Sequence, residues 1–376
     1  MSLHLIDRVR RDVASLRSRY AVFVMKRLFL SLALLVASPI ALYAAPAAQD
    51  LRIYAVDVEG GQATLFVSPA GQSLLVDTGW DGFDGRDAQR IVDAAHAAGL
   101  QRIDTVLLTH YHLDHAGGAV QLAQKIPVGM FLDHGTYFQQ DTETREPYKA
   151  YQALLASGKY KHVSVKVGEK LPIAGFDALA VSSDGAVITK PIAGAGQANA
   201  LCATAPKPKL DTTENGHSLG VLIRFAGSTI LDLGDLTSDR EYSLVCPANR
   251  LGKMDVLIVS HHGTDFSNSQ VFVHSIAPRV AVMDNGDHKG GSTIVIDAVK
   301  SSPGLQALYQ LHNAPPAGSP NPNGSVQGGP EHNASAQFIA NTPGVDGKRV
   351  DVIVHANGTV DVLNGRTGEV KHFARR

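Results

Sequence analysis

Residues 109–118 read Thr109-His110-Tyr111-His112-Leu113-Asp114-His115-Ala116-Gly117-Gly118, which places four potential metal ligands within six residues. This stretch directly follows residues 103–108, an aliphatic and β-branched run that predicts a strand. In an extended segment alternate side chains share a face, so His110 and His112 can grip one cation with their imidazoles. Asp114 and His115 fall on the turn into the next element and can reach a second cation. The stretch therefore predicts a dinuclear metal site at the end of a strand.

Strand-like and helix-like segments alternate along the rest of the chain. Helical periodicity covers residues 84–99 and 117–125, with a further helical stretch around 148–155. Because functional groups in α/β sheets collect where strands end, we expect the polar clusters behind several strands to meet at one edge. Apolar or β-branched runs predict strands at residues 51–58, 63–68, 73–77, 128–133, 163–167, 179–182, 218–225, 229–233, 256–259 and 280–284.

Length and composition favour one large α/β domain. The chain has 376 residues, of which 44% are hydrophobic, enough to bury a large core. We assign residues 48–376 to this domain. Residues 184–214 and 312–332 are predicted to be long loops because they are rich in Pro or Gly and show no periodicity, and such loops often cover sites. Residues 350–372 predict short strands around an Asn357-Gly358 turn.

The N-terminal segment has the composition of an export signal. Residues 25–47 begin with Met25-Lys26-Arg27, continue through an apolar run and end in small residues, which is the order of a secretory signal. We therefore predict a signal peptide within residues 1–47, with residues 1–24 either a long basic leader or a mis-assigned extension before Met25. A retained membrane anchor is the alternative. Removal of the signal would leave a periplasmic or secreted protein with no stable membrane anchor.

Charge argues for a small-molecule substrate rather than nucleic acid. Loss of residues 1–47 would remove seven basic and two acidic side chains, which changes the net charge from −1 to −6. A mildly acidic chain without Lys/Arg runs lacks the clustered basic charge that binds phosphate backbones. The two cysteines, Cys202 and Cys246, lack metal-binding spacing; in an oxidising compartment they form either one disulfide or two unpaired thiols.

Three more motifs, together with the histidine-rich stretch, resemble the metallo-β-lactamase superfamily. They are Leu75-Val76-Asp77-Thr78-Gly79, Leu233-Gly234-Asp235 and Ser260-His261-His262-Gly263. Residues 56–63, Val56-Asp57-Val58-Glu59-Gly60-Gly61-Gln62-Ala63, narrow the resemblance to the hydrolase domain of ComEC-like competence proteins and of phosphorylcholine esterases. The resemblance covers most of residues 51–300. It implies an αββα sandwich and a metal-dependent hydrolase, and it says little about the substrate.

The resemblance also implies a ligand set for two zinc ions. Histidines 110 and 112 would hold the first ion, and Asp114, His115 and His262 the second, with Asp235 as a bridge. His262 is preferred to His261 because the family more often places its ligand immediately before the glycine, and His261 would then line the pocket. A third imidazole for the first ion could come from His217, although Asn215 and Ser218 also fit a family pattern that lacks this ligand. For His217, metal contact and a pocket-lining or structural role therefore stay open.

Other residues are candidates for supporting roles. The resemblance gives Asp77 the task of holding the second ring nitrogen of a ligand histidine, against the alternative of a simple turn residue. His134 faces the site or is a hydrogen-bonded loop histidine. His288 and Lys289 follow a strand end where the family places substrate contacts, and a lysine there could hold an anionic group; the alternative is a solvated turn.

The implied chemistry is hydrolysis by a hydroxide that two zinc ions share, with Asp114 orienting the attacking water. We predict a phosphodiester substrate. The alternatives are a lactone, thioester or β-lactam, or a metal-binding relative without turnover. Asp235 stands where many β-lactamases carry cysteine, and His112 where diiron members carry glutamate, so both residues argue against those classes. The ligand types suit manganese and iron as well as zinc.

Overall fold

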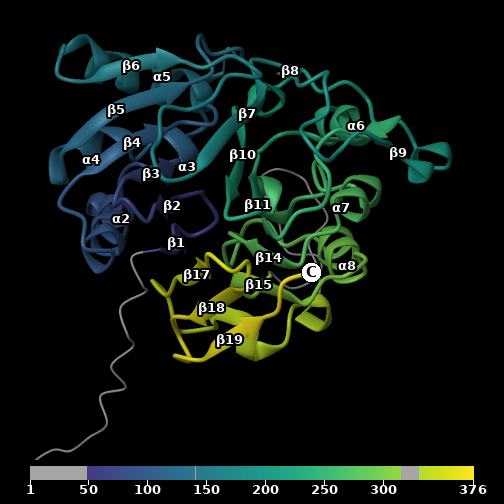
Figure 1. Ribbon diagram of the computed structural model, residues 1–376. Helices are drawn as coiled ribbons and strands as arrows, with labels where there is room; N and C mark the ends of the chain where they lie inside the picture. The colour runs from purple at the N-terminus through teal and green to yellow at the C-terminus, as the bar shows by residue number, and fades with distance from the viewer. Residues whose placement is uncertain (1–48, 140, 315–329) are drawn as a thin grey trace, which may run out of the picture. The chain divides into compact units, whose positions relative to one another are not determined.

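The structure is a computed structural model that describes residues 49–139, 141–314 and 330–376 (Figure 1). The predicted signal peptide, residues 1–47, lies outside the described residues, as does most of the predicted loop at 312–332. Within Ala48–Arg376, the described residues form one compact unit. Over the described ranges, no helix combines the length and the apolar character needed to cross a bilayer.

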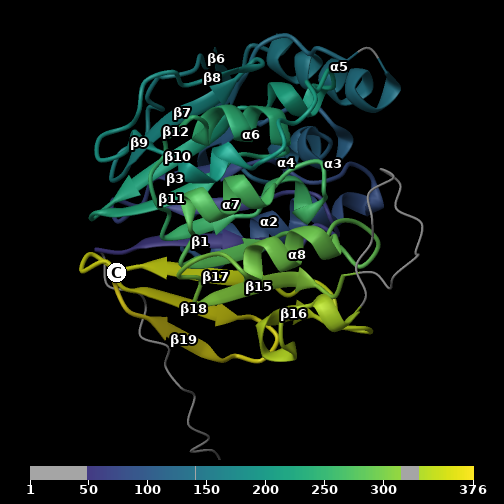
Figure 2. The same cartoon turned by 90° about the vertical axis from the view of Figure 1, so that its right-hand side faces the viewer.

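Two mixed β-sheets form the centre of the fold (Figures 1 and 2). In the first sheet the strands lie in the order β19-β18-β17-β1-β2-β3-β4-β5-β6. Strands β3 to β6 run parallel, and the other neighbours pair antiparallel. Their bounds are β1 (Leu51–Ala55), β2 (Thr64–Val67), β3 (Ser73–Val76), β4 (Ile103–Leu107), β5 (Val128–Asp133), β6 (Lys161–Ser164), β17 (Val350–Val354), β18 (Val360–Asn364) and β19 (Val370–Phe373).

The second sheet has the strand order β16-β15-β14-β13-β11-β10-β7-β8. Its strands from β11 through β13, β14 and β15 to β16 are parallel. A separate short pair joins β9 (Gln197–Ala198) to β12 (Ala248–Asn249). The bounds in the second sheet are β7 (Asp177–Ser183), β8 (Ala186–Val187), β10 (Gly220–Phe225), β11 (Ser228–Asp232), β13 (Val256–Ile258), β14 (Val280–Met283), β15 (Ala307–His312) and β16 (Ile339–Asn341).

Helices cover the outer face of each sheet. The first sheet carries α2 (Arg86–Ala97), α3 (Leu113–Ala116), α4 (Ala119–Lys125) and α5 (Thr142–Ala156), and the second carries α6 (Ser238–Val245), α7 (Gln270–Ile276) and α8 (Thr293–Lys300) (Figure 2). Short 3-10 turns complete the chain: η1 (Phe83–Gly85), η2 (Ala200–Ala203), η3 (Glu214–His217), η4 (Ser260–Gly263), η5 (Pro330–His332) and η6 (Ala336–Phe338).

Three apolar cores follow from this layering. Leu74 and Val76 of β3 point into the core between the two sheets, whereas Leu75 packs with Ile91 and Leu122 of the covering helices. The alternation arises because successive side chains of a strand face opposite sides of the sheet. A third core lies between the second sheet and α6 to α8. The layers are helix, sheet, sheet and helix, and the predicted αββα sandwich is confirmed.

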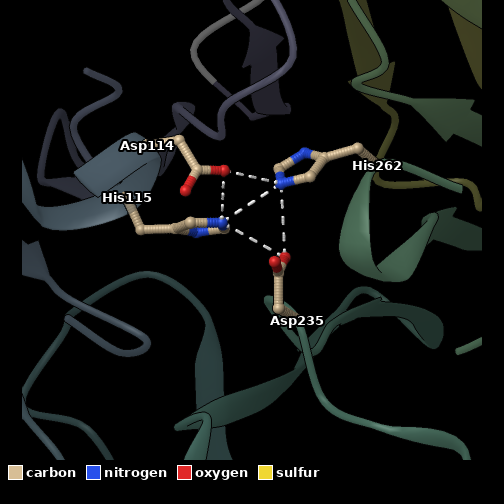
Figure 3. Close-up of side chains that lie close together, drawn as sticks. All are labelled: Asp114, His115, Asp235 and His262. Carbon is tan, nitrogen blue, oxygen red and sulfur yellow. Dashed lines mark hydrogen bonds and ion pairs between the residues drawn. The ribbon is translucent and has the colours of Figure 1, made fainter. Parts of the chain in front are cut away.

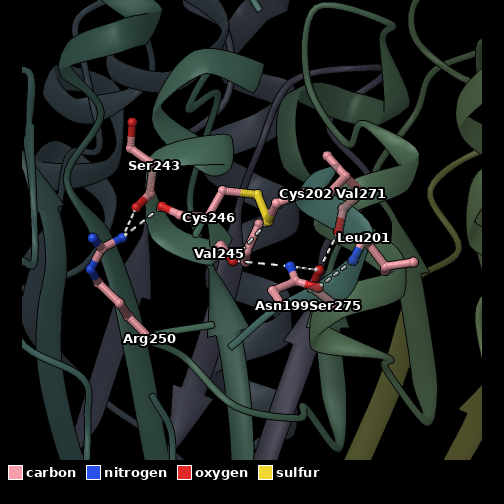
Figure 4. The surroundings of a disulfide bond; sticks show 9 residues. All are labelled: Asn199, Leu201, Cys202, Ser243, Val245, Cys246, Arg250, Val271 and Ser275. Carbon is pink, nitrogen blue, oxygen red and sulfur yellow. Dashed lines mark hydrogen bonds between the residues drawn. A yellow bond between two sulfur atoms is a disulfide. The ribbon is translucent and has the colours of Figure 1, made fainter. Parts of the chain in front are cut away.

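The predicted loop at 184–214 carries more structure than its composition indicates. It contains β8, β9 and η2, and a disulfide joins Cys202 to Cys246 (Figure 4). Asn199 donates hydrogen bonds to the Val245 carbonyl (3.0 Å) and to the Ser275 hydroxyl (2.6 Å), which adds a second attachment. The one-disulfide alternative is therefore the one that the structure adopts.

We expect the disulfide to stabilise the fold by about 2–4 kcal/mol, because it closes a loop with a sequence separation of 44 residues. The double variant C202S/C246S should lower the free energy of unfolding by that amount in urea titrations. A matched variant, Ser243→Ala, alters an exposed neighbour without changing the cross-link. A double variant as stable as the wild type would contradict the expectation.

Candidate metal centre

The carboxyl ends of five strands from both sheets supply the candidate site. Asp77 follows β3, the histidine-rich stretch follows β4, and Asp235 follows β11. In the second sheet η4 follows β13, and residues 284–291 follow β14. Because these strands are mostly parallel neighbours, their ends lie at one edge, as expected from the sequence.

Four buried side chains converge at this edge: Asp114, His115, Asp235 and His262 (Figure 3). The Nε2 atoms of His115 and His262 lie 3.1 Å apart. Oδ2 of Asp114 lies 3.2 Å from the first of these nitrogens and 3.1 Å from the second. Oδ1 of Asp235 lies 3.2 Å from His115 Nε2. The donor atoms of all four residues lie within 4.8 Å of one another, as the ligands of a single ion must.

A second pair of imidazoles lies beside this group. His110 Nε2 and His112 Nδ1 are 3.1 Å apart, in the segment between β4 and α3. Oδ2 of Asp235 lies 3.9 Å from His110 Nε2, on the opposite side of the carboxylate from the oxygen that faces His115. Asp235 therefore has one oxygen toward each group of histidines, which is the position required of a bridging ligand.

Hydrogen bonds behind the histidines fix which ring nitrogen faces the centre. Asp77 is fully buried, and its Oδ2 lies 2.7 Å from His115 Nδ1. The same oxygen accepts a hydrogen bond from the Thr109 hydroxyl (2.7 Å), whose oxygen lies 3.0 Å from His110 Nδ1. Since that hydroxyl already donates to Asp77, it accepts from His110. The Nε2 atoms of both histidines are thus free to bind a cation.

Burial and charge act in opposite directions on these groups. Burial lowers the pKa of His115, but the carboxylates of Asp235, Asp114 and Asp77 outweigh it and raise that pKa well above its usual value. Burial also lowers the pKa of His262, but the carboxylate of Asp235 outweighs this effect and raises that pKa to about 10. Burial raises the pKa values of Asp114 and Asp235, but nearby cationic groups hold both well below the usual range. The carboxylates of this group therefore stabilise a positive charge between them. Imidazole nitrogens together with carboxylate oxygens are a suitable donor set for divalent ions.

The turn η4 orients two adjacent histidines differently. His261 and His262 have φ angles of 55° and 54°, in the left-handed region that is strained for residues with a side chain. His262 faces the four-residue group, whereas His261 Nε2 lies 3.4 Å from Asp235 Oδ2 and 3.3 Å from Asn215 Nδ2. Burial lowers the pKa of His261 to about 4. The sequence-based preference for His262 agrees with this geometry, and His261 lines the pocket.

Asp284 is a functional candidate that the sequence did not single out. It directly follows β14, and its Oδ1 lies 3.5 Å from His262 Nδ1. The side chain is about 3% exposed, and neither carboxylate oxygen has a hydrogen-bond partner in the described part of the chain. A carboxylate behind the distal nitrogen of a ligand histidine orients the ring and raises its basicity. Asp284 lies behind His262 Nδ1 as Asp77 lies behind His115 Nδ1, but at 3.5 Å instead of 2.7 Å.

Replacement of Asp284 by asparagine should weaken metal binding about 10- to 100-fold, because the His262 ring loses its negatively charged support. Competition with a chromophoric chelator would measure the affinity. Asp287→Asn, in the same loop but at a side chain that is 58% exposed, is the matched control and should bind metal like the wild type. Equal affinities for Asp284→Asn and the wild type would remove Asp284 from the centre.

The structure does not bring His217 to the centre. Its Nδ1 lies 3.2 Å from Asp184 Oδ1, and its ring stacks on Phe138 with a centroid distance of 4.1 Å. These contacts hold it in the loop wall, while Asn215, two residues earlier, faces His261. Of the two roles left open by the sequence, the structural one fits these contacts, and we omit His217 from the ligand set.

Two further sequence candidates also lie elsewhere. His134 is fully buried, and its Nε2 lies 2.9 Å from Glu214 Oε1, so it is the hydrogen-bonded loop histidine of the two alternatives. His288 is the solvated turn residue of its two alternatives and does not line the pocket, because its side chain is 89% exposed and its Nε2 lies 3.5 Å from Oδ2 of Asp287. Its neighbour Lys289 does face the pocket. In this glycine-rich turn the two adjacent residues direct their side chains to different sides, and the sequence pattern does not show which of them faces the pocket.

A pocket of about 350 Å³ opens onto the centre. His112, Asp114, Asp235 and His261 form its metal-facing part, with Lys289 beside them. The rest of the pocket wall includes two acidic side chains, Glu143 and Asp211, and the exposed ring of Phe266. The centre is therefore open to a molecule of small size.

Comparison with known proteins agrees with this architecture. Residues 56–194 match the family model described as Metallo-beta-lactamase superfamily. The chain is 28% identical over 230 residues to "Competence protein ComA" of Neisseria gonorrhoeae, which covers 61% of this chain and 26% of that protein. It is 25% identical over 237 residues to "Recombination protein 2" of Haemophilus influenzae, covering 62% of this chain and 24% of that protein. The chain thus spans about a quarter of the length of these relatives.

A solved structure is also similar. The metallo-beta-lactamase fold protein YhfI from Bacillus subtilis superimposes with a TM-score of 0.43 at 14% sequence identity, covering 69% of this chain and 95% of that protein. The histidine-rich stretch lies within the matched residues 56–194. Residues 56–194 of this chain are thus similar to the metallo-β-lactamase superfamily, and the similar relatives include competence proteins of the ComEC-like family.

Proposed function

We propose that the protein is an exported, metal-dependent hydrolase that cleaves phosphodiester bonds in small molecules. The observation that carries the proposal is the convergence of two groups of imidazoles on the two oxygens of Asp235. One divalent cation would be held by His110, His112 and Asp235. The other would be held by Asp114, His115 and His262, with Asp235 shared. The disulfide supports export, because such bonds persist in oxidising compartments.

The donor set fits two cations of the zinc type. It combines imidazole nitrogens, which bind a cation in their neutral form and whose opposite ring nitrogens contact Asp77 and Thr109, with two buried carboxylates. When bound, two divalent cations lower the pKa of a water toward neutrality and offset negative charge on a phosphoryl oxygen. Asp114 lines the pocket, where its carboxylate can orient that water and accept its proton.

Pocket charge supports a small substrate over nucleic acid. The acidic side chains of Glu143 and Asp211 lie along the wall and would repel a polyanionic backbone. One buried ammonium, that of Lys289, lies at the inner end, where a single anionic group could be accommodated. A phosphodiester of a small molecule satisfies both conditions.

Hydrolysis assays on the full-length chain test the proposal. We expect zinc- or manganese-loaded protein to hydrolyse bis-p-nitrophenyl phosphate faster than a lactone or nitrocefin, and a chelator to remove that activity. His115→Ala should be inactive, and His288→Ala, at an exposed position outside the pocket, should retain wild-type rates. A rate that survives chelation would contradict metal dependence, and faster turnover of the lactone or nitrocefin would contradict the substrate class. Metal binding without turnover of any of the three would contradict catalysis.

A further inference from the structure

Lys289 is a buried lysine at the inner end of the pocket. The residue is 8% exposed, and its Nζ donates a hydrogen bond to Oδ2 of Asp114. The ammonium also lies 5.1 Å from the centroid of the Trp80 ring. Lysines are rarely buried unless they are paired, and Asp114 is the partner here.

The backbone fixes Lys289 relative to the centre. The Gly286 amide donates to the Lys289 carbonyl (2.8 Å), and the Gly291 amide donates to the His262 carbonyl (2.9 Å). Gly290 has φ +80°, and a Cβ at that position would overlap the His262 carbonyl, so only glycine allows this close approach. The loop that carries Lys289 is thereby attached to the backbone of a candidate ligand.

Charge balance at the inner pocket changes when metal is present. In the structure the Lys289 ammonium is neutralised by Asp114. On the proposed function, this carboxylate becomes a ligand of a divalent cation and offers less negative charge to the ammonium. A buried ammonium beside divalent cations is then costly unless another anion comes within hydrogen-bond reach. The pocket is open at this point, so a bound molecule can supply that anion.

We propose that Lys289 binds an anionic oxygen of the substrate and thereby selects phosphodiesters over neutral esters. The inference rests on the proposed function and adds the residue that discriminates between substrate classes. The ammonium donates to a non-bridging phosphoryl oxygen, and the Trp80 ring limits the directions in which it can move. A neutral lactone or thioester lacks the charged acceptor and leaves the ammonium without a strong partner.

The alternative role for Lys289 is to balance the charge of Asp114 alone. The two roles differ in what removal of the ammonium does. A lysine that only balances Asp114 competes with the metal, so its loss would strengthen metal binding and leave anion binding unchanged. A lysine that binds the substrate contributes directly to the affinity for a phosphate group.

Binding of inorganic phosphate to the metal-loaded, full-length protein distinguishes the roles without requiring turnover. We expect Lys289→Gln and Lys289→Met to bind phosphate about 10- to 100-fold more weakly in calorimetry, with unchanged metal content by elemental analysis. Lys289→Arg should retain most of the affinity because it keeps the charge. Lys253→Gln is the matched control, because Lys253 is exposed and lies before β13, at the end of the strand opposite to η4. This variant should bind phosphate like the wild type.

Two results would overturn the inference. Equal phosphate affinity in the wild type and both uncharged variants would show that Lys289 does not touch the anion. Stronger metal binding in both uncharged variants, with no loss of phosphate affinity, would show that it acts only through Asp114. In hydrolysis assays, the ratio of kcat/KM for bis-p-nitrophenyl phosphate to kcat/KM for a lactone should fall by a similar factor in Lys289→Gln and Lys289→Met. If the wild type binds phosphate through Lys289 but hydrolyses neither substrate, the proposed function fails while the anion site stands.

Discussion

Replacement of Asp235 by asparagine is expected to reduce metal-dependent hydrolysis by about a thousandfold or more. The carboxylate faces His110 with one oxygen and His115 with the other, so its loss affects both proposed cation positions. Lewis-acid stabilisation by bound cations contributes several kcal/mol, and each 1.36 kcal/mol corresponds to a factor of ten in rate. Asparagine preserves the shape of the side chain, so the fold should persist.

Rates and metal content should be measured on the same preparations. Asp235→Asn should lose at least one of the two ions along with activity, whereas Asp287→Asn, at an exposed carboxylate in a neighbouring loop, should keep both. A circular dichroism spectrum like that of the wild type would show that the fold is intact. If Asp235→Asn retained two ions and full activity, the bridging role would be wrong.

Replacement of Asp57 by alanine is expected to lower the free energy of unfolding by about 3–5 kcal/mol. The Asp57 side chain is fully buried and accepts hydrogen bonds from His312 Nε2 (2.7 Å), the Gly347 amide (2.7 Å) and a nitrogen of Arg90 (3.2 Å). It thereby joins the ends of β1 and β15 to helix α2 and to the loop before β17. Alanine would leave the buried His312 without its hydrogen-bonded carboxylate and would remove one of the three carboxylates that pair with the half-buried Arg90.

The pH dependence of this loss follows from the two pKa shifts. Burial raises the pKa of Asp57, but His312 and Arg90 outweigh it, so the net pKa lies below the ordinary 3.8. Its contribution is present above pH 3.8 and is lost as pH falls through the folded-state pKa. Burial lowers the pKa of His312, but Asp57 and Glu59 raise it above 6.5. That contribution is complete below pH 6.5 and is lost as pH rises through the folded-state value.

Urea titrations at pH 5.5 and pH 9 therefore test the pair. Asp57→Ala should be most destabilising at the lower pH, where both partners are charged in the folded state. Asp346→Ala is the matched control, because Asp346 also pairs with Arg90 (3.0 Å) but is 76% exposed, and should change stability by at most about 1 kcal/mol. Equal effects of the two substitutions would contradict a buried network.

Local sequence patterns predicted most strands, the helices over the first sheet and most of the residues of the centre, whereas they did not predict α6, α7 and α8 over the second sheet. His110, His112, Asp114 and His115 lie close together in the chain, so their convergence needs only one strand and one turn. Asp235 and His262 come from distant segments, but each follows a parallel strand of the second sheet, and the shared edge brings them to the histidines. The bounds of the predicted strands and helices differ from the observed ones mainly at the ends. For example, the helix predicted at 84–99 begins at Arg86, after a short 3-10 turn.

The remaining features depend on contacts for which the sequence carries no local signal. Asp57 and His312 are 255 residues apart, and nothing near either one indicates the other. Asp284 follows a strand end like many others, and only the tertiary structure places it behind His262. His217 and His288 were candidates by residue type, but each lies in a turn whose backbone directs the side chain away from the centre. Pairing of β17 with β1 likewise required the folded structure.

Anomalous diffraction at the zinc edge, on crystals grown with zinc, tests the dinuclear centre most directly. We expect two peaks about 3.5–4 Å apart. One should lie between His110 and His112, the other among Asp114, His115 and His262, with Asp235 between them. A single peak, no peak, or a peak only at the separate Asp57, Glu59 and His312 cluster would contradict the account.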